Sequence, residues 1–248
     1  MLSRGSTVIR YGGSLMAEPI SLVDALATTR AIRRYRDDPI PDADLNQIMW
    51  LATRAPSGSN RQGFRFVVLR DGPNAAAARA LIREGALQTW GNKRVKDQYD
   101  SGSGARDDSP KARMAKTMDH FVEHMHEAPV IVLACVKVHR PQMLGVGGSV
   151  WPAVQNLLLA ARALGYGGVI TGFHGPREAQ LRELLHLPPP ESVAIAATIP
   201  LGRPLGNHGP VRRRPLPELV YDDAWEAPAP WASDPPGTRF TQAGPPVA

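Results

Sequence analysis

The sequence contains a single cysteine, Cys135, among its 248 residues. One cysteine excludes an internal disulfide, and its position inside an apolar run predicts a buried, unreactive thiol. Long apolar stretches are also absent: none reaches the roughly 18 residues that a membrane-spanning helix needs. The N-terminus lacks the apolar core of a secretory signal. These absences predict a cytoplasmic protein that does not enter a membrane.

Aromatic residues are scarce too, at 6% of the chain. Lysine and arginine together number 29 against 23 aspartate and glutamate residues, which gives a net charge of +6. Such an excess suits an anionic partner. The basic residues are not interleaved with aromatics, and no nucleic-acid-binding motif is present. A small anionic ligand is therefore favoured over nucleic acid.

The composition changes along the chain and predicts three parts. Residues 1–18 are rich in glycine and serine, which predicts a disordered leader and makes Met16 a candidate true start. Residues 19–221 carry the helix and strand patterns of one domain. Within it, residues 73–127 are expected to form a helical insert that acts as a lid. Residues 222–248 are proline-rich and form a C-terminal extension.

Hydrophobic periodicity predicts the elements of the domain. Strands are expected at residues 64–69, 130–138, 169–173 and 193–199, and helices at 22–28, after Pro41-Asp42, and at 73–87, 111–127, 149–164 and 176–185. Residues 90–108 are polar, glycine-rich and charged, and are expected to be a mobile excursion. Strands interleaved with helices predict an α+β sandwich, with a mixed central sheet flanked by helices.

The helix expected at residues 149–164 is apolar on nearly every face. A single domain of this size has difficulty burying such a helix completely. The remaining apolar surface predicts a contact with another subunit.

A run of short polar side chains separates the second expected helix from the first strand. It reads Pro56-Ser57-Gly58-Ser59-Asn60-Arg61-Gln62. In extended chain, Asn60 and Gln62 project to one side, and each carboxamide offers a donor and an acceptor. Such a pair suits a flat heterocycle whose edge alternates acceptors and donors, as the pyrimidine ring of a flavin does. A turn whose polar side chains cap backbone groups explains the same residues.

Two basic clusters lie far apart in the sequence. Arg30 and Arg33 are three residues apart and share a face if the chain is helical there. Arg212 and Arg214 project to one side of an extended segment, because Pro215 and Pro217 exclude a helix. Guanidinium groups in pairs match the oxygens of a phosphate. Two solvated runs of charge are the alternative interpretation.

Four segments of the chain, in this order, resemble the FMN-dependent nitroreductase family. Thr29 to Tyr35 is similar to the family's arginine-rich opening motif, and Ala55 to Gln62 to its Pro-Ser-x-x-Asn-x-Gln loop. Gln155 to Gly167 resembles its interface helix with a glycine-rich exit, and Arg214 to Val220 its C-terminal signature. Each segment alone is a weak signal, whereas four in family order are specific.

The resemblance implies an α/β sandwich that forms a domain-entwined homodimer with two FMN sites at the subunit interface. It further implies hydride transfer from NADPH or NADH through FMN to a small aromatic electron acceptor, with no catalytic side chain. Ala31 stands where the family usually has a serine. Carried over to this chain, the phosphate and ribityl contacts are Arg30, Ala31 (through its backbone), Arg33, Arg212 and Arg214; the ring contacts are Pro56, Ser57, Gly58, Asn60 and Gln62; and Thr171 and Gly172 place a backbone N–H near the flavin N5.

Members of the same family can instead remove halogens, fragment flavin or store FMN, and no motif separates these roles here. Lys93, Arg94 and Lys96 lie in the insert and favour NADPH over NADH through its 2′-phosphate.

A different class is suggested by His120, Glu123 and His124, which match the His-x-x-Glu-His pattern of a zinc hydrolase. A solvated helix face explains this five-residue match better, and the zinc hydrolase remains a remote alternative.

Overall fold

The computed structural model describes residues 20–139 and 143–241. The expected leader (residues 1–18), Met16 and the end of the C-terminal extension lie outside the described residues. The centre of the described part is a four-stranded sheet in the order β1-β2-β4-β3. Its strands are β1 (Phe64–Leu69), β2 (Val130–Lys137), β3 (Gly167–Gly168) and β4 (Val193–Gly202).

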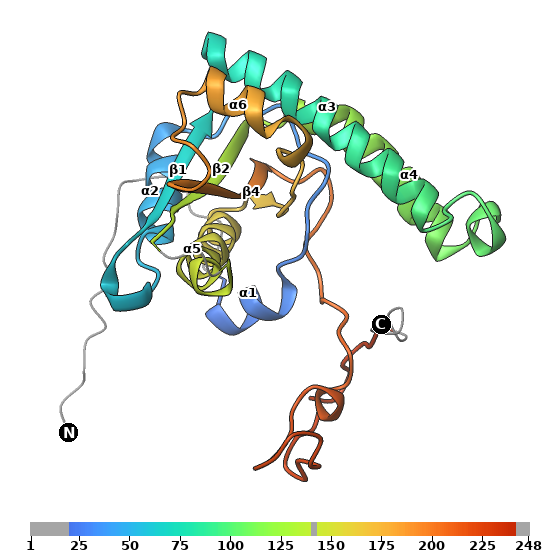
Figure 1. Ribbon diagram of the computed structural model, residues 1–248. Coiled ribbons are helices and arrows are strands. Elements are labelled where there is room, and N and C mark those ends of the chain that lie inside the picture. Colours follow the sequence, from blue (N-terminus) through green and yellow to red (C-terminus); the bar gives the residue numbers. More distant parts are fainter. Residues whose placement is uncertain (1–19, 140–142, 242–248) are drawn as a thin grey trace.

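Every pairing between these four strands is antiparallel, so the mixed sheet expected from the sequence is wrong for the described strands. The reason is the route that the chain takes between β1 and β2. Helices α3 (Pro73–Lys96) and α4 (Pro110–His124) leave the sheet and return to it as a hairpin (Figure 1). The chain therefore re-enters at the end where it left, and β2 runs opposite to β1.

Strand β2 is the middle of the core because both of its faces are buried. Val130, Val132, Ala134 and Val136 belong to one hydrophobic cluster, and Ile131, Leu133 and Cys135 to the other. All seven are at most 2% exposed. The buried strand predicted at residues 130–138 is thus confirmed. Burial also raises the pKa of the Cys135 thiol to about 11, which keeps it protonated and unreactive near neutral pH.

Helices cover both faces of the sheet and give the α+β sandwich expected from the sequence. One face packs against α2 (Asp42–Ala52) and α5 (Met143–Ala163), and α1 (Leu22–Thr28) lies against α5. The other face packs against α3, α4 and the short α6 (Glu178–Leu184). Figure 1 shows these two layers on opposite sides of the strands. Within the described chain, no helix is both long and apolar enough to cross a membrane.

The helical hairpin is longer and more ordered than the sequence predicts. Helix α3 continues to Lys96, so the first part of the expected excursion at residues 90–108 is helical. Trp90 is buried, and its indole N–H donates to an Asp119 carboxylate oxygen at 2.7 Å. Arg94 joins the same carboxylate at 2.7 Å. These contacts fasten α3 to α4 and override the local polar composition, which was the only signal available from the sequence.

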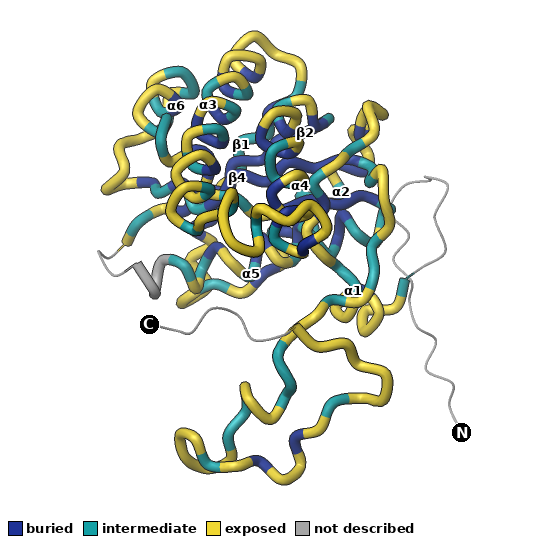
Figure 2. The backbone as a smooth tube through the Cα atoms, turned by 90° about the vertical axis from the view of Figure 1, so that its right-hand side faces the viewer, coloured by how far each residue is buried: buried dark blue, intermediate teal, exposed yellow. Residues whose placement is uncertain are grey.

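The segment after residue 212 leaves the body of the molecule (Figure 1) and is mostly exposed (Figure 2). It is held by its own contacts: the Trp231 indole donates to Asp222 at 3.0 Å, and the Leu216 N–H donates to Asp234 at 3.0 Å. Trp225 remains 82% exposed. Apart from the single turn Leu216–Glu218, this segment is irregular, as its proline content predicts.

Candidate functional site

The arginine-bearing segment at residues 29–35 is extended rather than helical. The Ile32 N–H donates to the Gly168 carbonyl of β3 at 3.0 Å, and the Arg36 N–H donates to Arg203 at 2.8 Å. The shared helical face expected for Arg30 and Arg33 is therefore wrong. Helix α1 ends at Thr28. The residues that follow pair with the edge of the sheet instead of continuing the helix, because the backbone groups of a buried edge need hydrogen-bond partners.

A second segment, residues 205–211, runs beside the first. Its backbone N–H groups at Leu205, Gly209 and Val211 donate to the carbonyls of Arg34, Thr28 and Ala27, at 3.1, 3.3 and 3.1 Å. Arg212 follows Val211 directly, and Arg214 lies two residues further. Segments from opposite ends of the sequence thus lie side by side, at the edge of the sheet that β3 forms. Arg30 itself lies close to Gly209.

The side chains gathered here are short of partners. Thr29 Oγ1, Arg33 Nε, Arg162 Nε and His208 Nδ1 are buried without a hydrogen bond. An unpaired buried polar group costs about 1–3 kcal/mol. Burial, partly offset by the phenol of Tyr35 and reinforced by the charge of Arg30, lowers the pKa of Arg33. In the part of the chain that the structure describes, neither Arg33 nor Arg162 forms an ion pair with a carboxylate, so these positive charges fit an anion.

Arg33 also borders a cavity of about 210 Å³ that lies between its own segment and α4. Arg34, His120 and Glu127 line the same cavity. Because a guanidinium has five donors in a fork, Arg33 can face an anion with one edge while its stem lines this cavity.

The polar loop is a single 3₁₀ turn, Gly58–Asn60, and not the extended chain that the sequence suggested. Ser59, Asn60 and Gln62 have left-handed backbone angles, with φ of 52°, 52° and 50°. The loop folds back because the Ser57 hydroxyl accepts the Gln62 N–H at 2.8 Å. This brings the two carboxamides together: Gln62 Nε2 donates to Asn60 Oδ1 at 3.2 Å.

Left-handed residues other than glycine are strained, and such strain is found mainly at functional sites. Pro56, Gly58, Asn60 and Gln62 are all exposed, and Ser57 is half-buried. The loop thus holds its polar groups in a fixed arrangement while leaving them open to a ligand.

The loop and the arginines lie at opposite ends of the sheet in one chain. The loop is tied to the early part of α5 by the Gly58 N–H, which donates to Ser149 Oγ at 3.4 Å, and its end pairs with Lys137. The arginine segment instead crosses Gly168, just beyond the end of α5. From Ser149 to Leu164 an α-helix rises roughly 22 Å. Figure 1 shows the same separation across the sheet.

Thr171 and Gly172 lie on the arginine side. The strand expected at residues 169–173 is wrong: the ladder contains only Gly167–Gly168, followed by an isolated bridge between Thr171 and Thr198. Thr171 N–H and Oγ1 both donate to the Thr198 carbonyl at 2.9 Å. Nδ1 of the buried His174 ring lies 3.1 Å from the Thr198 hydroxyl oxygen. This contact holds the turn at residues 171–174 against β4. Gly172 is left exposed, with open space where a Cβ would lie.

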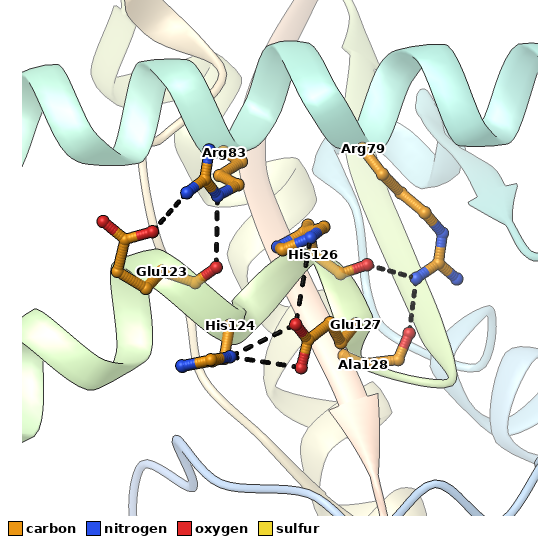
Figure 3. Close-up of polar contacts among 7 residues, drawn as sticks. All are labelled: Arg79, Arg83, Glu123, His124, His126, Glu127 and Ala128. Carbon is orange, nitrogen blue, oxygen red and sulfur yellow. Dashed lines mark hydrogen bonds and ion pairs between the residues drawn. The ribbon is translucent and has the colours of Figure 1, made fainter.

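The pattern suggesting a zinc hydrolase does not form a metal site. The rings of His120 and His124 lie 4.5 Å apart, centroid to centroid. Glu123 turns away from both and pairs with Arg83 on α3, while His124 Nδ1 faces Glu127 at 3.2 Å (Figure 3). Among the described residues, no three metal-ligating side chains gather in a way that can hold a metal. Glu123 instead joins α4 to α3 through its ion pair with Arg83.

Arg162 and His208 were missed by the sequence analysis. The sequence offers one signal for Arg162, since it is the only charged residue in the apolar run from Ser149 to Leu164. Nothing in the sequence marks His208, which reaches the site only because residues 205–211 pair with the arginine segment.

Known proteins resemble this chain in sequence and in fold. Residues 26–203 match the model of the nitroreductase family. A protein from Thermus thermophilus named NADH dehydrogenase is 30% identical over 208 residues, which cover 77% of this chain and 90% of that protein. An iodotyrosine deiodinase from Thermotoga neapolitana is 25% identical over 185 residues, or 74% and 88% of the two chains.

Among solved structures, a putative nitroreductase from Desulfovibrio desulfuricans in complex with FMN is 27% identical. It superposes with a TM-score of 0.58 over 82% of this chain and 96% of that one. The matched region contains the arginine segment, the polar loop and the Gly-rich exit of α5, and the chain belongs to the nitroreductase family.

Proposed function

We propose that this protein is an FMN-dependent oxidoreductase that passes a hydride from NADPH or NADH to nitroaromatic or quinone acceptors. The observation that carries the proposal is the meeting of residues 29–35 with residues 205–211, which gathers positive charge and buried donors without partners. The FMN-bound relative from Desulfovibrio desulfuricans supports the choice of FMN as the anion. We further propose a cytoplasmic setting, in which the buried Cys135 stays reduced.

The residues present fit FMN at three places. The phosphate and ribityl chain would be held on the arginine side, the ring would lie against the exposed polar loop, and the exposed peptide at Gly172 would supply an N–H to the ring. The residues assigned to these roles are Arg30, Ala31, Arg33, Arg212 and Arg214 for the phosphate side, Pro56, Ser57, Gly58, Asn60 and Gln62 for the ring edge, and Thr171 and Gly172 for the N–H.

The polar loop contacts the early part of α5, and the arginine segment crosses the chain just beyond the end of this helix, roughly 22 Å further along its axis. This placement supports a site that two chains build. In a two-fold symmetric homodimer, the loop of one chain can lie against the arginine segment of its partner. Exposed apolar side chains on the helices of that layer support such a contact: Leu22, Val23 and Leu26 on α1 are 68%, 75% and 53% exposed, and Trp151 on α5 is 43% exposed.

When bound, FMN supplies the chemistry, which is acceptance of a hydride from the nicotinamide and its transfer to the acceptor in a second, separate step. The protein's part is to bind and orient. The Asn60 and Gln62 amides match the donors and acceptors of the pyrimidine edge. The arginines would hold the phosphate, and the Gly172 N–H would lie beside the ring, where a fixed donor stabilises negative charge without reorganising. Ala31 can offer only its backbone N–H, because it lacks the hydroxyl of the serine that the family usually has at this position.

An anaerobic titration followed by visible absorbance tests this proposal. The purified protein is expected to be yellow, to bleach when NADPH or NADH is added, and to regain its colour when a nitroaromatic follows. Removal of halogens is the role named for the Thermotoga neapolitana relative. Offering 3-iodotyrosine in place of the nitroaromatic distinguishes this role from nitroreduction. Bound FMN that neither nicotinamide bleaches would contradict the oxidoreductase proposal and leave FMN storage.

A further inference from the structure

Two side chains outside the set assigned to FMN, Arg162 and His208, lie close enough for their charges to interact, and His208 also interacts with Arg30. Arg162 is in the last turn of α5, and His208 lies on the segment at residues 205–211. His208 Nε2 is 3.3 Å from the Tyr166 carbonyl, which fixes the ring with its N–H at Nε2. The opposite nitrogen, Nδ1, then carries a lone pair in the neutral ring. Both residues are partly exposed.

Two positively charged side chains on different elements lie near His208. The pKa of His208 is lowered, first by burial and then by the charges of Arg162 on α5 and Arg30 on the arginine segment. Only the hydrogen bond to the Tyr166 carbonyl acts in the other direction. Within the described part of the chain, no ion pair joins Arg30 or Arg162 to a carboxylate.

Buried polar atoms without partners occur at the same place. Arg162 Nε and His208 Nδ1 have no hydrogen bond, as is also true of the hydroxyl of Thr29 next to Arg30. Structures rarely leave such groups unpaired unless a ligand or ion completes them. Two arginines from separate elements therefore lie near the neutral His208 ring, at a place where a bound anion would complete the unpaired groups.

We propose that Arg162 and His208 join Arg30 in binding the phosphate of FMN, and that His208 takes up a proton at Nδ1 when the phosphate binds. This inference rests on the FMN function proposed above. It adds two residues to the site and links flavin binding to pH.

The direction of the pH dependence follows from the charges. Without phosphate, burial and two arginines keep the His208 ring neutral near neutral pH. A dianionic phosphate favours the charged ring and raises its pKa. Binding therefore draws a proton from solution, and FMN affinity falls as pH rises through the pKa that His208 has in the complex. Above pH 7 the phosphate itself stays largely dianionic, because its second pKa is about 6, so the change reports on the histidine.

Calorimetry on the full-length apoprotein tests the proposal. FMN and riboflavin are titrated at pH 7.5 in buffers of different ionisation enthalpy, which gives affinity and proton uptake together. Arg162→Gln is expected to weaken FMN binding about tenfold or more, as loss of a charged hydrogen bond does. His208→Gln is expected to abolish proton uptake and to flatten the pH dependence of FMN affinity. Riboflavin, which lacks the phosphate, is expected to bind all variants alike.

Arg106→Gln, at an exposed position at the end of the helical hairpin, is the matched control and is expected to behave as wild type. Thermal melting of each apoprotein checks that the glutamine variants fold. Wild-type protein that binds FMN with no proton uptake, or glutamine variants with unchanged FMN affinity, would overturn this inference and leave the proposed function intact. Wild-type protein that binds no FMN would overturn both.

Discussion

Co-expressing two variants that each lack flavin is expected to restore flavin binding. One variant carries Asn60→Ala and Gln62→Ala in the polar loop, and the other carries Arg30→Ala and Arg33→Ala. In a homodimer of either variant, both sites lack one half of their contacts. In a mixed dimer, one site joins the two damaged halves and the other joins two intact halves. Random assembly then gives about a quarter of the wild-type flavin content.

The reason for this expectation is the distance between the two halves. The loop lies beside Ser149 at the start of α5, and the arginines lie beyond its end. Isolating mixed dimers with two different affinity tags raises the expected flavin content to about half of the wild-type value. Each variant expressed alone is the control and is expected to be nearly colourless. Mixed dimers that are as colourless as the parents would contradict a site shared between two chains.

Replacing Gly85 by alanine is expected to destabilise the protein by about 2–4 kcal/mol, which exceeds most overpacking costs of 1–3 kcal/mol. A Cβ at Gly85 would lie 2.1 Å from the Phe173 carbonyl oxygen, which is backbone and cannot rotate away. Helix α3 must then move off the turn at residues 172–175, where it packs through Gly85. The change is measured as the free energy of unfolding in urea.

Gly91 on the same helix is the matched control. A Cβ there meets no atom within 4 Å. Because alanine favours a helix interior over glycine by about 1 kcal/mol, Gly91→Ala is expected to leave the protein as stable or slightly more stable. Equal effects at the two positions would show that helix propensity, and not the close approach to Phe173, decides the outcome.

Much of the core was predictable because its signals are local. The buried strand at residues 130–138 and the helix at residues 22–28 both form as their sequences indicate. The polar loop was also identified from its own residues. The left-handed backbone angles of the loop were not predictable, because they depend on the hydrogen bond between the Gln62 N–H and the Ser57 hydroxyl.

The errors share a cause, which is pairing between segments distant in sequence. Residues 29–36 are extended because the carbonyls of Gly168 and Arg203 accept the N–H groups of Ile32 and Arg36. Residues 90–96 are helical because Trp90 and Arg94 reach Asp119 on α4. His208 enters the site through the pairing of residues 205–211 with residues 27–34. No short stretch of the sequence contains both partners of any of these contacts.

We propose that FMN is held between two copies of this chain, and native mass spectrometry of the purified protein tests this claim. The expected species contains two chains and two FMN molecules, and it loses the flavin when Arg30 and Arg33 are replaced by alanine. A single chain without flavin, unchanged after incubation with excess FMN, would contradict the claim.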